Sequence, residues 1–383
     1  MILDNLRVRV YNVLFGDAIF ISFPERTSVG IENRHILIDV GNVLSGRGGD
    51  DAAFQPVIED INRELDGRPL DLYVMTHEHL DHVQGLYFAK QNGLSQPAAS
   101  YAWLTASAAE DYYSNHPRAK ERRDRIQQSL VEINGFFGAS RVGFSVLQAM
   151  LATNDARNTE ACVNYLRMFA RTTSYVHRGF GLAGTHPFTE ATLQVLAPEE
   201  DTSVYYGNFQ PLASGLARST ELGDDRPSFP PPPPGVDAGA FRDLVEARRR
   251  GYVDTLLAID RAANNTSVVF TLEWRGWRLM FPGDAEIRSW KEIDKRSLLK
   301  PIHFLKVSHH GSANGLPPKS ILDKMLPETP PDDRPRHAIV STFPDAYPGV
   351  PDTSTLSTLG RRCDLQSVES QPLGGFVDVE FPG

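Results

Sequence analysis

Four side chains that commonly bind divalent metal ions lie within six residues of one another: His77, His79, Asp81 and His82. In an extended segment, side chains two positions apart point to the same side, so His77 and His79 can hold one ion together. Where the extended segment ends and the chain turns, Asp81 and His82 point toward a neighbouring position, which suits a second ion. The cluster therefore predicts a site for two divalent ions, with zinc as the first candidate and manganese or iron as alternatives.

Two later segments carry further ligand types where apolar stretches end. Asp284 follows Phe-Pro-Gly at 281–283, and a carboxylate in this place could bridge two cations. His309 and His310 follow the apolar stretch 302–308. Because sites in α/β proteins are commonly assembled where strands end on one side of a sheet, we expect Asp284 and these imidazoles to lie near the metal site.

The elements that must position these residues can be inferred from the hydrophobic pattern. Alternating or apolar β-type residues predict a hairpin over 7–23 and strands over 35–40, 72–76, 191–196, 267–274, 277–281, 302–308 and 337–342. Helical spacing of apolar residues predicts helices over 55–65 and 83–90. The histidine cluster thus lies at a strand-to-helix junction in a protein of the α/β (α+β) class.

The rest of the chain carries two expected insertions in a single domain of residues 1–383. Residues from about 106 to 170 have a charged, helical pattern and predict a helical insertion. A second insertion, from about 200 to 260, combines a loop with a helix and contains five consecutive prolines at 230–234. The proline run is expected to be a rigid spacer, although it or the helical insertion could bind a protein partner.

Composition limits the partners. The chain has 39 Lys and Arg against 48 Asp and Glu, so its net charge of −9 would repel a polyanion unless a local basic patch attracts it. Two runs, 118–125 and 248–250, are rich in arginine, but we expect both to be solvated helix faces. Two cysteines cannot form a disulfide framework, and no apolar stretch is long enough to span a membrane, so a cytoplasmic protein without membrane contact is expected.

The segment 76–82 resembles the signature of the metallo-β-lactamase superfamily. Asp284 is similar to that family's bridging aspartate and His309 to its last histidine ligand. Asp39 resembles the strand-end aspartate that orients the histidine loop without binding metal itself. The resemblance implies a four-layer αββα sandwich, here with a helical insertion, that holds two divalent metal ions.

Within this superfamily, the hydrolase domain of ComEC-type DNA-uptake proteins is the branch that the chain resembles most. The similar segments are 12–18, 264–267 and 305–312, which span most of the chain, while 106–170 and 200–260 have no counterpart. The resemblance implies a substrate with phosphodiester bonds, with nucleic acid as one candidate.

One ligand departs from the family pattern. The superfamily usually supplies a histidine in the segment before the strand that leads to Gly-Asp, whereas this chain has Asn264 and Asn265 there. The first ion could bind through the amide oxygen of one of these asparagines, which we favour. It could instead bind through His177 or His186, farther upstream, or with fewer protein ligands.

The expected activity is that of a metal-dependent phosphodiesterase or nuclease that uses a metal-bound hydroxide. Asp81 and Asp284 would hold and position the metal ions. His310, Ser312 or Lys306 would stabilise the negative charge that develops on the substrate, although Lys306 could equally be a packing residue. One alternative is a hydrolase of lactones, thioesters or phosphocholine-type esters, which a deep apolar pocket beneath the helical insertion would favour. Another is a partner-binding module with a weakened metal site.

Overall fold

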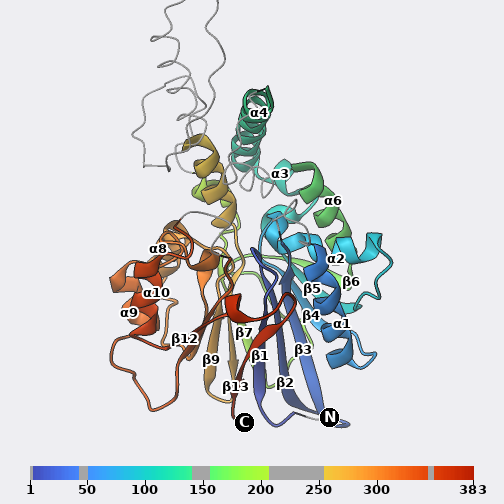
Figure 1. The fold of residues 1–383 in the computed structure, drawn as a ribbon, viewed down its shortest axis with the longest axis vertical. Coiled ribbons are helices and arrows are strands. Elements are labelled where there is room, and N and C mark those ends of the chain that lie inside the picture. The colour runs from blue at the N-terminus through green and yellow to red at the C-terminus, as the bar shows by residue number, and fades with distance from the viewer. Residues whose placement is uncertain (1–2, 43–50, 140–155, 207–253, 344–348) are drawn as a thin grey trace, which may run out of the picture.

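The computed structural model describes residues 3–42, 51–139, 156–206, 254–343 and 349–383 (Figure 1). The described strands form two sheets. The first has the order β13-β1-β2-β3-β4-β5-β6 and the second the order β12-β11-β10-β9-β8-β7. Both sheets combine parallel and antiparallel pairs, so the prediction of a mixed α/β protein is confirmed.

The strands of the first sheet are β1 (Leu6–Tyr11), β2 (Ala18–Thr27), β3 (Gly30–Val40), β4 (Leu70–Met75), β5 (Ala99–Thr105), β6 (Ala170–Val176) and β13 (Phe376–Phe381). The strands of the second sheet are β7 (Ala191–Ala197), β8 (Val269–Trp274), β9 (Trp277–Phe281), β10 (Phe304–Lys306), β11 (His337–Val340) and β12 (Asp364–Ser367). The α-helices with defined bounds are α1 (Phe54–Leu65), α2 (Leu80–Gln91), α3 (Tyr112–Asn115), α4 (Pro117–Ala139), α6 (Ala156–Arg167), α8 (Ile287–Lys295), α9 (Lys319–Met325) and α10 (Thr353–Gly360).

The two sheets pack face to face. Because side chains alternate along a strand, every second residue of β1 and β8, such as Val8 and Leu272, enters the core between the sheets. The outer face of the first sheet is covered by α1, α2 and α6, and Ile61 and Leu86 belong to that core. The outer face of the second sheet is covered by α8 and α9 through residues such as Trp290. The arrangement is therefore helix, sheet, sheet, helix.

The strands at the end of the chain were not predicted. The sequence pattern placed the last strands at 302–308 and 337–342, but the structure adds β12 and β13 after them. β13 pairs antiparallel with β1, so the last strand of the described chain lies beside the first (Figure 1). The short stretch Asp364–Ser367 is only half-buried, which explains why its hydrophobic pattern is weak.

The helical insertion begins at one end of the sandwich, and its last helix, α6, packs on the outer face of the first sheet. Its described part contains α3, α4 and α6 and ends where β6 begins, at Ala170. Figure 1 shows α4 projecting beyond the sheets, and its residue Ile126 packs against Ile259 and Ala262 of the helical residues 254–264. The proline run 230–234 and the arginine run 248–250 lie outside the described residues. Among the helices that the structure describes, none combines the length and apolar character needed to cross a membrane.

Candidate metal centre

The loop that follows β4 is fixed by Asp39 at the end of β3. The buried carboxylate of Asp39 accepts hydrogen bonds from the amide of Thr76 (2.8 Å) and from its hydroxyl (2.6 Å). His82 Nδ1 lies 2.8 Å from the same carboxylate. Because a carboxylate accepts, the hydrogen of this bond lies on Nδ1, and the neutral His82 ring would present an unprotonated Nε2 on its other side. Asp39 thus orients the His82 ring and holds the loop that begins at Thr76.

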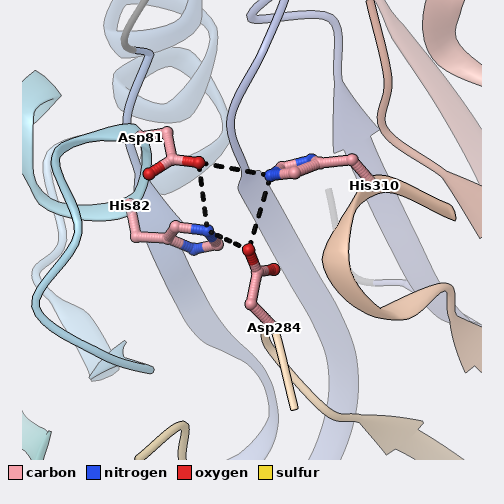
Figure 2. A group of neighbouring side chains, drawn as sticks. All are labelled: Asp81, His82, Asp284 and His310. Carbon is pink, nitrogen blue, oxygen red and sulfur yellow. Dashed lines mark hydrogen bonds and ion pairs between the residues drawn. The ribbon is translucent and has the colours of Figure 1, made fainter. Parts of the chain in front are cut away.

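Four buried side chains converge next to this loop: Asp81, His82, Asp284 and His310 (Figure 2). His82 Nε2 lies 3.3 Å from Asp284 Oδ2, and His310 Nε2 lies 3.3 Å from Asp81 Oδ2. The remaining nitrogen–oxygen distances are 3.6 Å for His310 to Asp284 and 3.8 Å for His82 to Asp81. Two ligands of a tetrahedral ion bound at 2.0–2.1 Å are about 3.3 Å apart. The group could therefore hold a metal ion.

The members of this group come from both sheets. Asp81 and His82 begin α2, directly after the first sheet's β4, whereas Asp284 and His310 follow β9 and β10 of the second sheet. Gly283 allows the approach, because its backbone is left-handed (φ 54°) and a Cβ there would lie 2.9 Å from the Cβ of Thr76. The ends of strands in two packed sheets thus meet at one edge of the sandwich.

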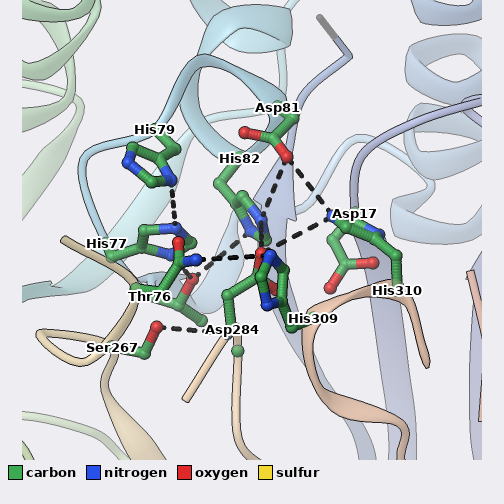
Figure 3. Close-up of polar contacts among 12 residues, drawn as sticks. Asp17, Thr76, His77, His79, Asp81, His82, Ser267, Asp284, His309 and His310 are labelled. Carbon is green, nitrogen blue, oxygen red and sulfur yellow. Dashed lines mark hydrogen bonds and ion pairs between the residues drawn. The ribbon is translucent and has the colours of Figure 1, made fainter. Parts of the chain in front are cut away.

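His77 and His79 form a second pair of nitrogens beside this group (Figure 3). His77 Nε2 lies 3.1 Å from His79 Nδ1, and both side chains are buried. This distance is close to that between two ligands of one tetrahedral ion. Burial and the neighbouring His82 and His79 hold the pKa of His77 well below its ordinary value, so the ring is neutral and able to bind metal.

The two adjacent histidines differ from the expected arrangement. His310, which we expected to stabilise substrate charge, is a member of the four-residue group, whereas His309 lies outside it. His309 Nδ1 is 3.3 Å from Glu286 Oε1, and with Asp260 these residues form another group that could hold a cation. Burial alone would lower the pKa of His309, but Glu286 and Asp284 raise it to about 9. Both histidines have left-handed backbones (φ 48° and 51°), which turn their side chains to different sides.

Of the two asparagines, Asn264 is the one with an oxygen available. Its buried Oδ1 has no hydrogen-bond partner among the described residues, while its Nδ2 donates to Asp260 (3.2 Å) and Glu286 (3.1 Å). In Asn265, Oδ1 instead accepts from the amide and hydroxyl of Ser289, at 2.9 Å each. Asn264 therefore suits a ligand role, and Asn265 fixes the start of α8.

The other residues considered from the sequence lie in different surroundings. His186 stacks on the ring of Phe188, and His177 contacts the carbonyl of Arg178, so the structure brings neither into the two groups. Lys306 is fully buried in an ion pair with Asp17, 2.8 Å away. It therefore acts as a packing residue of the interior and does not face a substrate. The Ser312 hydroxyl lies 3.0 Å from His309 Nδ1.

In the absence of a metal ion, the carboxylates and histidines of the group act on one another's pKa. Burial raises the pKa of Asp284, but His82 and His310 outweigh it and hold the pKa well below its usual range. Burial lowers the pKa of His82, but Asp284, Asp81 and Asp39 raise it well above its ordinary value. Asp81 Oδ1, Asp284 Oδ1 and His82 Nε2 are nevertheless buried without hydrogen bonds among the described residues. Because unpaired buried polar atoms are costly, these atoms fit a bound divalent ion.

Several site residues were missed by the sequence reasoning. Glu286 and Asp260 contact Asn264, and two arginines of the insertion, Arg123 and Arg167, line a cavity beside His79. The position of Glu286, two residues after Asp284, was the only signal in the sequence, and acidic residues are common where helices begin. The arginines could not be found, because the pattern does not show where the insertion lies relative to the cluster.

No model of a known protein family matches the chain, and a comparison with curated proteins gave no match either.

Proposed function

We propose that this protein is a metal-dependent hydrolase of the metallo-β-lactamase fold that cleaves phosphodiester bonds. The observation that carries the proposal is the buried group of Asp81, His82, Asp284 and His310, in which carboxylate oxygens and an imidazole nitrogen lack hydrogen bonds. The arrangement helix, sheet, sheet, helix supports it, because the fold expected from the motif has the same layers.

The chain offers ligands for two ions. His77, His79 and the Oδ1 of Asn264 would hold one, and the four-residue group would hold the other. Bound divalent ions supply Lewis acidity and lower the pKa of water to about 7, which provides a nucleophile without Ser or Cys. The protein itself orients the ligand side chains and keeps solvent away from them. Asp39 fixes the ring of His82, and burial of the four-residue group strengthens its electrostatic interactions.

A basic groove next to the site supports an anionic substrate. The groove has a volume of about 560 Å³ and is lined by four cations, Arg261, Arg288, Lys291 and Lys295. Two carboxylates also line it: Glu286, which contacts His309, and Glu292, which pairs with Lys295 at 2.6 Å. The lining therefore keeps a net positive charge. Local cationic surface of this kind can attract phosphate groups although the net charge of the chain is −9.

The run 118–125 is only partly the solvated helix face that the sequence predicted. Lys120 pairs with Asp124 and Arg125 with Glu121 on the exposed face of α4. Arg122 instead donates to the carbonyl of Ser203, and Arg123 lines the cavity beside His79, so these two arginines depart from that prediction.

A second candidate, a hydrolase of small esters, is favoured by one observation. A cavity of about 390 Å³ lies between His79 and the helical insertion, and Ile126, Leu130 and Val163 form part of its wall. A partly apolar cavity of this size is typical of sites for small molecules.

The proposal is tested by metal analysis combined with an activity assay. Protein purified without added metal is analysed for its metal content and assayed on bis(4-nitrophenyl) phosphate with zinc or manganese. Asp81→Ala combined with His82→Ala should lose metal and turnover while remaining folded. The matched control is the same double change at the ion pair of His337 and Asp364, on β11 and β12.

Each outcome has a distinct meaning. Bound metal with phosphodiester turnover supports the proposal, and turnover of a lactone or thioester alone supports the second candidate. Bound metal with no turnover on a panel of esters supports a partner-binding module. A wild-type protein that binds neither zinc nor manganese would overturn the assignment of the metal centre.

A further inference from the structure

The cavity beside His79 joins the metal-binding loop to the helical insertion. Its volume is about 390 Å³, within the range of small-molecule sites. One part of its lining is the loop with Glu78 and His79, and the opposite part comes from α4, α6 and the helical residues 254–264. His79 is 3% exposed, and its Nε2 is buried without a hydrogen-bond partner among the described residues. The cavity therefore borders His79, whose Nδ1 lies beside His77 and whose Nε2 has no such partner.

Two guanidinium groups line the cavity. Uncharged neighbours hold them in place. Arg123 lies over the ring of Tyr113, 4.2 Å from its centroid. Arg167 donates from Nε to the carbonyl of Ala108 (2.6 Å) and from Nη1 to Asn164 Oδ1 (2.5 Å). Within the described part of the chain, no carboxylate forms an ion pair with either arginine. Two positioned cations thus share one cavity next to the metal-binding loop.

The carboxylates of the cavity do not cancel these cations. Glu110 and Glu160 are exposed, so solvent weakens their effect. Glu78 is half-buried and lines the same cavity, so it offsets part of the charge of the two arginines but not all of it. The Ser107 hydroxyl donates to Glu78 at 3.5 Å and gives this carboxylate a partner of its own.

The remaining wall is apolar, with Ile126 and Leu130 from α4, Val163 from α6 and Ile259. A cavity with an apolar wall and two fixed guanidinium groups suits an amphipathic molecule that carries a carboxylate or a phosphate. We propose that this cavity binds the departing part of the substrate and that Arg123 and Arg167 bind an anionic group on that part. This inference rests on the proposed hydrolase function. In the reaction, water forms the new P–O bond, the P–O bond to the departing group breaks, and that group leaves with a proton from the water.

A pair of substrates tests the inference directly. Methyl 4-carboxyphenyl phosphate has an anionic departing phenol, and its counterpart carries the methyl ester in place of the carboxylate. We expect a lower KM for the substrate with the carboxylate, and Arg123→Gln or Arg167→Gln should raise that KM about tenfold, as expected for loss of a charged hydrogen bond. The KM for the methyl ester substrate, in which only the phosphodiester is charged, should not change. Arg125→Gln, on the same helix but paired with Glu121, is the matched control and should alter neither value.

A binding measurement separates failure of this inference from failure of the proposed function. Calorimetry on metal-depleted protein compares 4-hydroxybenzoate, the departing product, with its methyl ester. Binding of 4-hydroxybenzoate that weakens about tenfold in both Gln variants and recovers in Arg167→Lys supports the anionic subsite even if no substrate is turned over. Equal affinity of the wild type and both variants for 4-hydroxybenzoate, or no binding to any of them, overturns it whatever the turnover.

Discussion

The ammonium nitrogen of Lys306 lies 2.8 Å from Oδ1 of Asp17, in a buried ion pair that joins the second sheet to the loop between β1 and β2. Ser341 donates its hydroxyl to the same carboxylate. The amide of Asp17 donates to the carbonyl of Asp81 (3.0 Å), and His310 Nδ1 is 3.1 Å from the carbonyl of Ser341. The ion pair therefore supports the backbone beside one metal-group residue and the ring of another.

Removal of one partner of this ion pair should lower the stability of the protein more than removal of both. Asp17→Asn or Lys306→Met leaves a buried polar or charged group unpaired, which costs about 3–5 kcal/mol of unfolding free energy. The double variant should recover a large part of this loss. Urea unfolding measures the stability, and zinc content reports whether the group persists. The interpretation fails if the double variant is as unstable as the sum of the two single variants.

His309 and His310 should contribute differently to the affinity for metal. Because His310 belongs to the four-residue group, His310→Gln should weaken zinc or manganese binding more than His309→Gln does. Competition with a chromophoric chelator measures both affinities, with circular dichroism as the control for folding. A larger loss in His309→Gln would transfer the ligand role to His309, as the sequence had predicted.

Asp39→Asn should weaken metal binding although Asp39 is outside the metal group. The carboxylate accepts from Thr76 and orients His82, and changes to such orienting residues typically cost about 10–100-fold in metal affinity. Asp71→Asn is the matched control, because Asp71 also accepts a backbone hydrogen bond, from His35 at 2.8 Å. Equal metal affinity in the two variants would contradict the orienting role.

Chelation of the metal should lower the thermal stability of the protein. An ion that binds only the folded state stabilises it by about 2.7 kcal/mol at a free concentration of 100 times Kd. Differential scanning calorimetry with and without EDTA should show this shift in the wild type and not in Asp284→Asn. Asp364→Asn, which changes an exposed carboxylate on β12, should keep the shift.

His35 should make unfolding depend on pH well below neutrality. Burial and the neighbouring Arg68, Arg7 and Arg34 lower its pKa from 6.5 to about 3. Between these values the unfolded chain binds a proton that the folded chain does not, so stability should fall as pH falls, by up to about 1.4 kcal/mol per pH unit. His35→Gln should flatten this part of the curve in urea unfolding. Parallel curves for the two proteins would show that His35 does not titrate in this way.

Much of the fold could be predicted because its strands have clear patterns. The predicted strands coincide with β1 to β4 and β7 to β11. In most of these strands the burial of the side chains alternates or is continuous, which gives a clear hydrophobic pattern; β10 is too short to show one by itself. β6 was missed because its side chains are exposed or half-buried except at Val176. β5 is buried mainly at its end, and the surrounding polar residues obscured it.

Most residues of the candidate site could be predicted from the sequence, but their individual roles and the residues around them could not. Asp81, His82 and Asp284 converge as expected, because strand ends on one edge of a sandwich are close in space. The distinction between His309 and His310 depends on left-handed backbones that L-residues rarely adopt, and local sequence gives no signal for them. The cavity arginines depend on how an insertion folds back over the sandwich, which is a tertiary property.

The origin of the metal group in two sheets has a consequence for biosynthesis. Asp81 and His82 leave the ribosome about 200 residues before Asp284 and His310, and β13 must be made before it can pair with β1. The ligand set therefore forms only when most of the chain has been translated and the sheets have docked. Full coordination of an ion by this group would therefore have to wait until residues 284 and 310 have been made and the two sheets have docked.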